Sequence, residues 1–200
     1  MKIAVLASGR GSNFEALCKA DLGPGRVELL VCDRPDAPVA GLARRLGVEI
    51  LGLDPGPKRT VLSVECETRL ADELVRRGTD LVCLAGFMRM LKGPMLSAFR
   101  GRIMNVHPSL LPAFPGLDSQ RRALEYGVKI AGCTVHYVDE GMDTGPIIAQ
   151  AAVEVREGDG PEDLAGRILS REHEIFPLAV RLHCEGRLAV AGRRVSIREP

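Results

Sequence analysis

Residues 2–19 of the chain are KIAVLASGRGSNFEALCK, and this stretch decides the fold. The apolar run over 2–7 is typical of a buried strand, and the turn after it contains Gly9 and Gly11. A helical pattern begins at Ser12. A strand that leads through a glycine-rich turn into a helix is the first half of a βαβ unit, so the stretch predicts a parallel sheet.

The same alternation continues through the first half of the chain. Further strands are expected at 28–32, 49–53 and 81–84, and helices at 40–46 and 60–77. Right-handed crossovers between such strands build a Rossmann-like, doubly wound α/β sheet with helices on both faces. Ligands of such sheets bind at the carboxyl ends of the strands, so we expect the site along that edge.

The second half of the chain has a different pattern. A short buried strand is expected at 103–106, and the longer runs at 130–138 and 147–156 alternate as strands of a β extension do. Residues 161–185 form one long amphipathic helical pattern, and a hairpin is expected around Gly192. The prediction is a single domain over 1–200, with a mostly parallel sheet, a C-terminal β extension and a long C-terminal helix.

The composition limits the kinds of partner. The chain has 27 Lys and Arg against 26 Asp and Glu, so it offers no broad basic surface for nucleic acid. No apolar run approaches the ~20 residues of a membrane span, and the first one reaches Gly9 too early for a signal peptide. The six cysteines form no Cys-x-x-Cys pair, so reduced thiols are expected. We therefore expect a cytoplasmic protein, monomer or homodimer, with small-molecule ligands.

The glycine-rich turn is a candidate anion site, because glycines let a ligand approach the backbone N–H groups at the start of the helix. Phe14 occupies the position of the third glycine of a dinucleotide-binding turn, which argues against a nicotinamide enzyme. Asp33, at the end of the second strand, is accordingly interpreted as a turn residue. By itself the turn would equally fit a plain strand-to-helix connection capped by Ser12.

The run NVHPSLLP at 105–112, followed by FPG at 114–116, contains the first chemically informative residues. Asn105 and His107 are two residues apart at a strand end, so both side chains point to the same side and can address one carbonyl group. An isolated pair of this kind would also fit a structural hydrogen bond. Both interpretations stay open on this run alone.

Two further runs follow expected strands. In TVHYVDEGMDTGP, at 134–146, Thr134 and His136 share a strand face, and the loop after them can bring Asp143 over the imidazole of His107. Taken alone, its acids would also fit a solvated loop. The run GFMRML at 86–91 fits both core packing and the lining of a pocket.

Together these runs resemble the folate-dependent formyltransferase family, in its order and spacing and over nearly the whole chain. The resemblance implies that the chain transfers the formyl group of 10-formyltetrahydrofolate, a co-substrate, to the amine of glycinamide ribonucleotide in de novo purine biosynthesis. It also divides the chain into a phosphate-binding βαβ half at 1–100 and a catalytic and folate-loop half at 101–200.

The resemblance implies a role for each candidate residue. The catalytic residues are Asn105, His107 and Asp143. The residues that support them by ordering a water are Thr134 and His136. The residues that bind the phosphate and ribose of the substrate are Gly11, Ser12, Asn13 and Glu172. The residues of the folate pocket are Met88, Arg89, Met90, Leu91, Asn105, Asp139, Glu140, Gly141, Met142 and Asp143.

Two positions depart from the family pattern. Gln120 stands where relatives often carry a histidine near the substrate. Ser63 falls near the position of an arginine that binds the glutamate tail of the folate, a role that Lys58 or Arg59 would then have to take. These departures affect binding of the substrates rather than the chemistry.

The implied reaction needs donors for a negative oxygen and an acceptor for the proton of the attacking amine, but no metal. We expect Asn105 and His107 to serve the oxygen, with the pKa of His107 raised by Asp143. Two alternatives remain: a nicotinamide- or nucleotide-binding enzyme, and a regulatory nucleotide-binding module in which His107 and Asp143 are structural. Formyltransferases that act on methionyl-tRNA, and formyltetrahydrofolate deformylases, are expected to need an additional domain.

Overall fold

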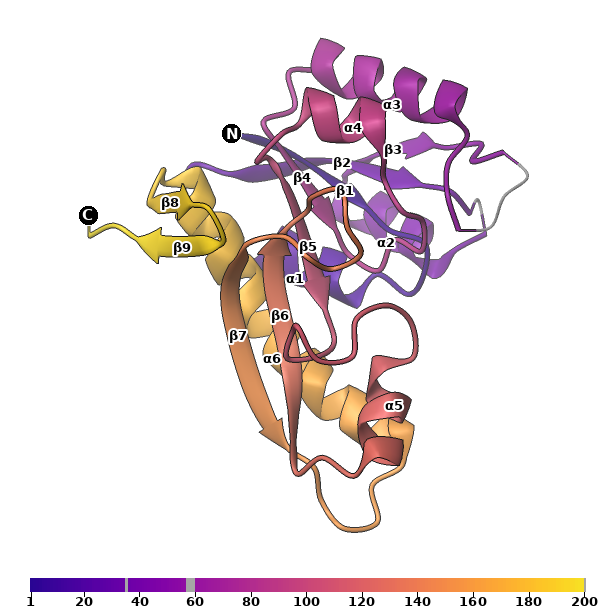
Figure 1. Cartoon of the computed structure of the whole chain (residues 1–200). Helices are drawn as coiled ribbons and strands as arrows, with labels where there is room; N and C mark the ends of the chain where they lie inside the picture. The colour runs from indigo at the N-terminus through magenta and orange to yellow at the C-terminus, as the bar shows by residue number, and fades with distance from the viewer. Residues whose placement is uncertain (35, 57–59, 200) are drawn as a thin grey trace.

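The computed structural model describes residues 1–34, 36–56 and 60–199. These residues form one nine-stranded sheet with the strand order β3-β2-β1-β4-β5-β6-β7-β9-β8 (Figure 1). The strands from β3 to β5 are parallel, whereas β6 runs antiparallel to both β5 and β7. The predicted α/β class, with its mostly parallel sheet and β extension, is confirmed.

The elements follow the expected order along the chain. The strands are β1 (Lys2–Leu6), β2 (Arg26–Cys32), β3 (Glu49–Gly52), β4 (Leu81–Leu84), β5 (Ile103–His107), β6 (Ile130–Tyr137), β7 (Ile147–Glu154), β8 (Leu188–Ala191) and β9 (Arg194–Ile197). The helices are α1 (Ser12–Lys19), α2 (Pro38–Leu46), α3 (Val64–Arg76), α4 (Gly93–Ala98), α5 (Ser119–Tyr126) and α6 (Pro161–Cys184).

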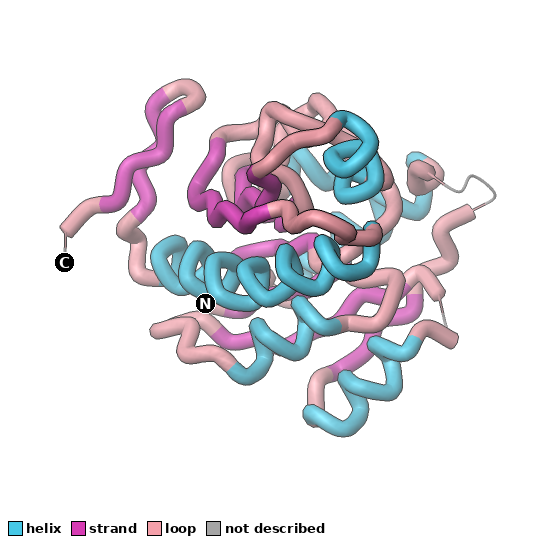
Figure 2. Tube along the Cα trace, turned by 90° about the horizontal axis from the view of Figure 1, so that it is seen from below, coloured by secondary structure: helices cyan, strands magenta, loops and turns pink. Residues whose placement is uncertain are grey.

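The core lies on both faces of the parallel strands. Successive residues of β1 alternate between the faces: Ile3 and Val5 pack into a cluster with α1, α2 and α6, and Ala4 and Leu6 into a cluster with α3 and α4. In Figure 2 the long α6 lies next to α1, with which it packs. Because helices cover both faces of the parallel strands, the carboxyl ends of these strands remain available for a site.

One predicted helix begins later than its pattern indicated. The expected helix at 60–77 begins at Val64, because the Ser63 hydroxyl accepts the Cys66 N–H and caps it. Val61 instead pairs with Met90 in an isolated bridge. The short helices α4 and α5, of six and eight residues, are elements that the sequence patterns did not predict.

All six cysteines are free, and five of them are buried. Along the parts of the chain that the structure describes, no helix is both long enough and apolar enough to cross a membrane.

Candidate active site

The first candidate residues meet where β5 pairs with β6. The antiparallel register places Asn105 opposite His136 and His107 opposite Thr134. Side chains of directly opposed residues point to the same face of a sheet, so these four are neighbours. The structure therefore brings together residues that lie about 30 positions apart in the sequence.

Asp143 completes this group from the loop after β6. Its Oδ2 lies 3.4 Å from His107 Nδ1 and accepts a hydrogen bond from the Gly116 N–H at 2.8 Å. Its Oδ1 lies 3.5 Å from Asn105 Nδ2 and 3.7 Å from His136 Nε2. Asp143 has a positive φ of 55°, which aspartate tolerates better than most residues and which turns its carboxylate back over the strands.

Hydrogen bonds orient the two imidazole rings. His136 Nδ1 lies 2.8 Å from the Tyr137 carbonyl, to which it donates, and its Nε2 lies 3.2 Å from Asn105 Nδ2 and 3.7 Å from Asp143 Oδ1. His107 Nε2 donates to the Phe114 carbonyl at 3.0 Å, which leaves Nδ1 facing Asp143. Protonation of His107 at Nδ1 would turn this contact into an ion pair.

The pKa of His107 differs from the expectation. Burial lowers it, and this effect outweighs the opposing effects of the Asp143 carboxylate and the Phe114 carbonyl. The Asp143 carboxylate thus acts on this pKa in the expected direction, but burial reverses the net result. Burial also acts to raise the pKa of Asp143, but hydrogen bonds from His136 and Gly116 and the charge of His107 bring it below its usual value. Asp143 is thus the charged member of the pair.

Thr134 has a different role from the expected one. Its hydroxyl is fully buried, donates to the Ser109 carbonyl at 2.7 Å and accepts from Leu111 N and Gln150 Nε2, both at 3.0 Å. One donor and two lone pairs are then used, so no capacity remains for ordering a water. Gln150 also donates to the Leu111 carbonyl at 2.9 Å. Thr134 and Gln150 hold the loop behind His107, and no motif marked Gln150.

The residues expected to bind the ribonucleotide lie around the start of α1. Gly11 is the N-cap, with a φ of 85°, so the helix is not capped by Ser12. Asn13 Nδ2 donates to Glu172 Oε2 of α6 at 2.6 Å, although 159 positions separate the two residues. Glu172 is only 6% exposed, and burial raises its pKa against the opposing effect of Asn13. The buried Oδ1 of Asn13 has no partner among the described residues.

The residues expected to bind folate differ in exposure. Met88 is 56% and Met142 52% exposed, whereas Leu91 is buried in the cluster under α3 and α4. The loop over 139–142 is exposed, and Asp139 organises it by accepting from the Gly141 N–H and the Thr144 hydroxyl. Leu91 is therefore a core residue, while Met88 and Met142 are accessible.

The structure describes the surroundings of Gln120 and Ser63, the two departures from the family pattern. Gln120 lies in α5, where its side chain accepts a 3.4 Å hydrogen bond from Ser119. Ser63 caps α3 and so has a structural role. Lys58 and Arg59, the proposed substitutes, lie outside the described residues.

Comparisons with known proteins show which family the chain belongs to. The sequence profile described as "Formyl transferase" matches residues 1–180. The chain is 44% identical over 183 residues to the phosphoribosylglycinamide formyltransferase of Bacillus subtilis, covering 90% of this chain and 93% of that protein. It is 46% identical to the trifunctional purine biosynthetic protein adenosine-3 of Drosophila pseudoobscura pseudoobscura, covering 98% of this chain but 14% of that longer protein.

A solved structure is similar along the whole chain. The glycinamide ribonucleotide transformylase 1 of Symbiobacterium toebii superposes with a TM-score of 0.94 at 54% identity, covering 100% of this chain and 94% of that one. The chain therefore belongs to the formyl transferase family. Within that family it groups with the phosphoribosylglycinamide formyltransferases, the glycinamide ribonucleotide transformylases of de novo purine biosynthesis.

Proposed function

We propose that this chain transfers the formyl group of 10-formyltetrahydrofolate to the amine of glycinamide ribonucleotide, with Asn105, His107 and Asp143 as its catalytic residues. The observation that carries the assignment is the group around Asp143, in which an ionised carboxylate lies within 3.7 Å of an amide and two imidazoles. The nicotinamide alternative lacks its third glycine, and the regulatory alternative leaves this group without a use.

The formyl oxygen becomes negative when the amine attacks, so donors must face it. Asn105 Nδ2 offers one donor, because the N–H that faces Asp143 is 3.5 Å from its carboxylate and is held only weakly there. His107 offers the second donor after it takes up a proton from solvent at Nδ1, because the 3.4 Å contact with Asp143 is long enough for this N–H to be shared with the formyl oxygen. A developing negative charge raises the proton affinity of the ring, so the ring becomes charged in the transition state rather than in the ligand-free protein.

The attacking amine must lose a proton, and the departing folate nitrogen must gain one. Asp143 is ionised, so it can accept the amine proton through a water and then return it to the departing folate nitrogen. His136, whose Nε2 faces both Asn105 and Asp143, orders this water, a role that Thr134 cannot share. In this scheme Asn105 and His107 face the negative charge on the formyl oxygen, and Asp143 faces the positive charge on the attacking amine.

The two substrates are held by different parts of the chain. In this proposal Gly11, Ser12 and Asn13 bind the phosphate and Glu172 the ribose, so residues 1–100 mainly position the ribonucleotide. The folate lies against 88–91 and 139–143, near the catalytic group of the second half. We place the protein in the cytoplasm, as a monomer or homodimer, and size-exclusion chromatography with light scattering will determine which.

The direct test incubates the protein with glycinamide ribonucleotide and 10-formyltetrahydrofolate and measures the formylated ribonucleotide by mass spectrometry. Formation of this product at a rate proportional to enzyme supports the proposal. No product, together with a change in NADH fluorescence on adding protein, would favour the nucleotide-binding alternative.

Glu172→Gln is expected to weaken ribonucleotide binding and to stabilise the protein. Because the raised pKa of Glu172 means that folding disfavours its charged form, its stabilising contribution is present at acid pH and is lost as pH rises through that folded-state pKa. The glutamine variant should therefore melt higher than the parent at pH 8 but not at pH 4. Its KM for the ribonucleotide should rise about tenfold, since a charge-assisted hydrogen bond to the ribose is lost. An unchanged KM would remove Glu172 from the binding site.

Activity is expected to persist in EDTA. Every charge that develops in the proposed reaction is met by Asn105, His107 or Asp143, so no Lewis acid is required. The measurement is the initial rate after prolonged incubation with the chelator, followed by removal of the chelator and addition of zinc. A lasting loss that zinc reverses would contradict this mechanism.

A further inference from the structure

The segment over 86–92, which is expected to bind the pterin of the folate, has no regular secondary structure of its own. It connects β4 to α4, and only Met90 takes part in a bridge, with Val61. A segment outside a sheet or helix must satisfy its backbone groups elsewhere, so its shape depends on the residues that supply those partners.

The first anchor comes from the ends of β1 and β2. Ser8, which is 2% exposed, donates its N–H to the Gly86 carbonyl at 3.2 Å and accepts the Met88 N–H on its hydroxyl at 3.3 Å. One residue further along the segment, Arg89 Nε donates to Asp33 Oδ2 at 2.6 Å. Both partners are therefore loop residues that lie one or two positions after a strand.

The second anchor comes from α3. Glu67 is 2% exposed, and its Oε1 accepts the N–H groups of Lys92 and Met95 at 2.6 and 3.2 Å. It fixes the end of the segment and the start of α4 at once. Two buried acids thus hold the segment, Asp33 at its middle and Glu67 at its end, and neither takes part in the chemistry at Asp143.

The pair of Asp33 and Arg89 is almost dry, with side-chain exposures of 3% and 12%. Removing one partner of a buried ion pair costs far more than removing one from the surface. The other carboxylate oxygen, Asp33 Oδ1, is buried without a hydrogen-bond partner among the described residues. The contact with Arg89 is therefore what compensates for burying this acid.

We infer that Asp33 is a positioning residue for the formyl donor: by holding Arg89 it keeps the backbone over 88–90 in the shape that receives the pterin. This inference rests on the proposed function, because the segment is expected to bind folate. Asp33 does not touch the reacting atoms, so its loss should weaken donor binding and leave the chemical step and the ribonucleotide site unaffected.

The test is Asp33→Asn, measured by titration calorimetry with tetrahydrofolate, the reaction product, as the probe. Asparagine keeps one oxygen acceptor for Arg89 and nearly the same volume, so the change removes mainly the charge. We expect the Kd for tetrahydrofolate and the KM for the formyl donor to rise about tenfold. Turnover and the KM for the ribonucleotide should stay within about twofold, a separation that general loss of structure would not produce.

A double-mutant cycle and a second variant keep the test decisive. Arg89→Lys keeps the positive charge but not the fork geometry, so it should weaken tetrahydrofolate binding less than Asp33→Asn does. The double variant should bind tetrahydrofolate no more weakly than Asp33→Asn alone, because both changes break the same contact. If Asp33→Asn does not fold, Asp33→Glu takes its place in the same binding measurement, since it keeps the charge but moves the carboxylate away from Arg89 by one methylene group.

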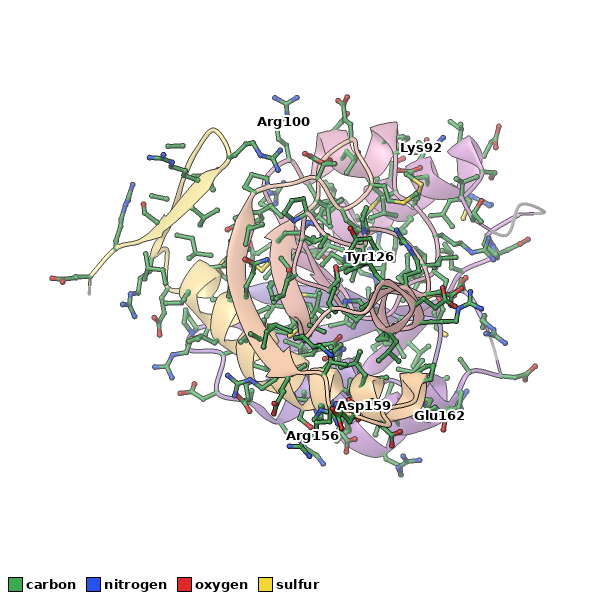
Figure 3. All side chains as sticks on the ribbon, turned by 60° about the horizontal axis from the view of Figure 1, so that its bottom comes forward. Lys92, Arg100, Tyr126, Arg156, Asp159 and Glu162 are labelled. Carbon is green, nitrogen blue, oxygen red and sulfur yellow. The ribbon has the colours of Figure 1, made fainter. Side chains whose placement is uncertain are left out.

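The matched control is Asp159→Asn. Asp159 is also an almost buried carboxylate paired with an arginine, Arg167, but it lies at the opposite end of the molecule from Lys92 (Figure 3). Its variant should bind tetrahydrofolate as the parent does. A parent that binds no tetrahydrofolate would overturn the proposed function. A parent that binds it, with Asp33→Asn and Arg89→Lys equal to it, would overturn only the role of Asp33.

Discussion

Asp143→Asn is expected to lower kcat by about two to three decades while ribonucleotide binding stays within about twofold. The charge of Asp143 acts where protons move in the transition state, and an interaction of that kind is typically worth ~3–4 kcal/mol. Binding is preserved because the phosphate and ribose are assigned to Gly11–Asn13 and Glu172. The loss should therefore appear equally in kcat and in kcat/KM.

The pH dependence of this variant tests the link to His107. Burial already lowers the pKa of His107, and the Asp143 carboxylate opposes that effect. Without the carboxylate the pKa falls further, so the protonated ring is lost at a lower pH. The alkaline limb of the rate profile should therefore move to lower pH in Asp143→Asn.

Asp118→Asn is the control for Asp143→Asn. Asp118 has the same φ of 55°, so both variants place an asparagine in the left-handed region, which it tolerates. The Asp118 carboxylate is 65% exposed and, among the residues that the structure describes, pairs with a surface arginine, so its loss should leave the rate profile unchanged. If Asp143→Asn turns over within a few-fold of the parent, Asp143 is an ordinary loop acid and the catalytic assignment fails.

Gly11→Val is expected to destabilise the fold by about 2–6 kcal/mol, which is a large part of the stability of a domain. Gly11 has a φ of 85°, and a Cβ there would lie 2.6 Å from Val39 Cγ2 of α2. From the sequence alone, a side chain at position 11 is expected to crowd a bound phosphate. The structure shows that the added side chain would meet α2 first, so stability falls before affinity can be measured.

Gly47→Ala separates the two causes of this loss. Gly47 also has a positive φ, of 69°, but a Cβ there would meet nothing within 4 Å. Urea denaturation of Gly47→Ala should therefore report backbone strain alone, about 1–2 kcal/mol, and Gly11→Ala should lose clearly more. Equal losses of stability in the two alanine variants would show that Val39 moves aside at little cost. The contact between α1 and α2 would then not explain why position 11 is a glycine.

The sequence by itself determined the elements with strong local patterns. The apolar run of β1, the glycine-rich turn after it and the 24-residue α6 depend on period and on capping residues, which are local properties. The spacing of Asn105 and His107 on one strand likewise fixed their common side. The family resemblance supplied the roles, because its motifs occur in runs of consecutive residues.

Only the tertiary structure decided the environments of the charged groups. Asp33, Glu67 and Glu172 look like surface charges in the sequence, yet each is buried, because its partner comes from a segment 25 to 159 positions away. The lowered pKa of His107 and the hydrogen bonds that occupy the Thr134 hydroxyl likewise depend on residues that are distant in the sequence. Burial and hydrogen bonding are sums over neighbours that folding brings together, so no local pattern contains them.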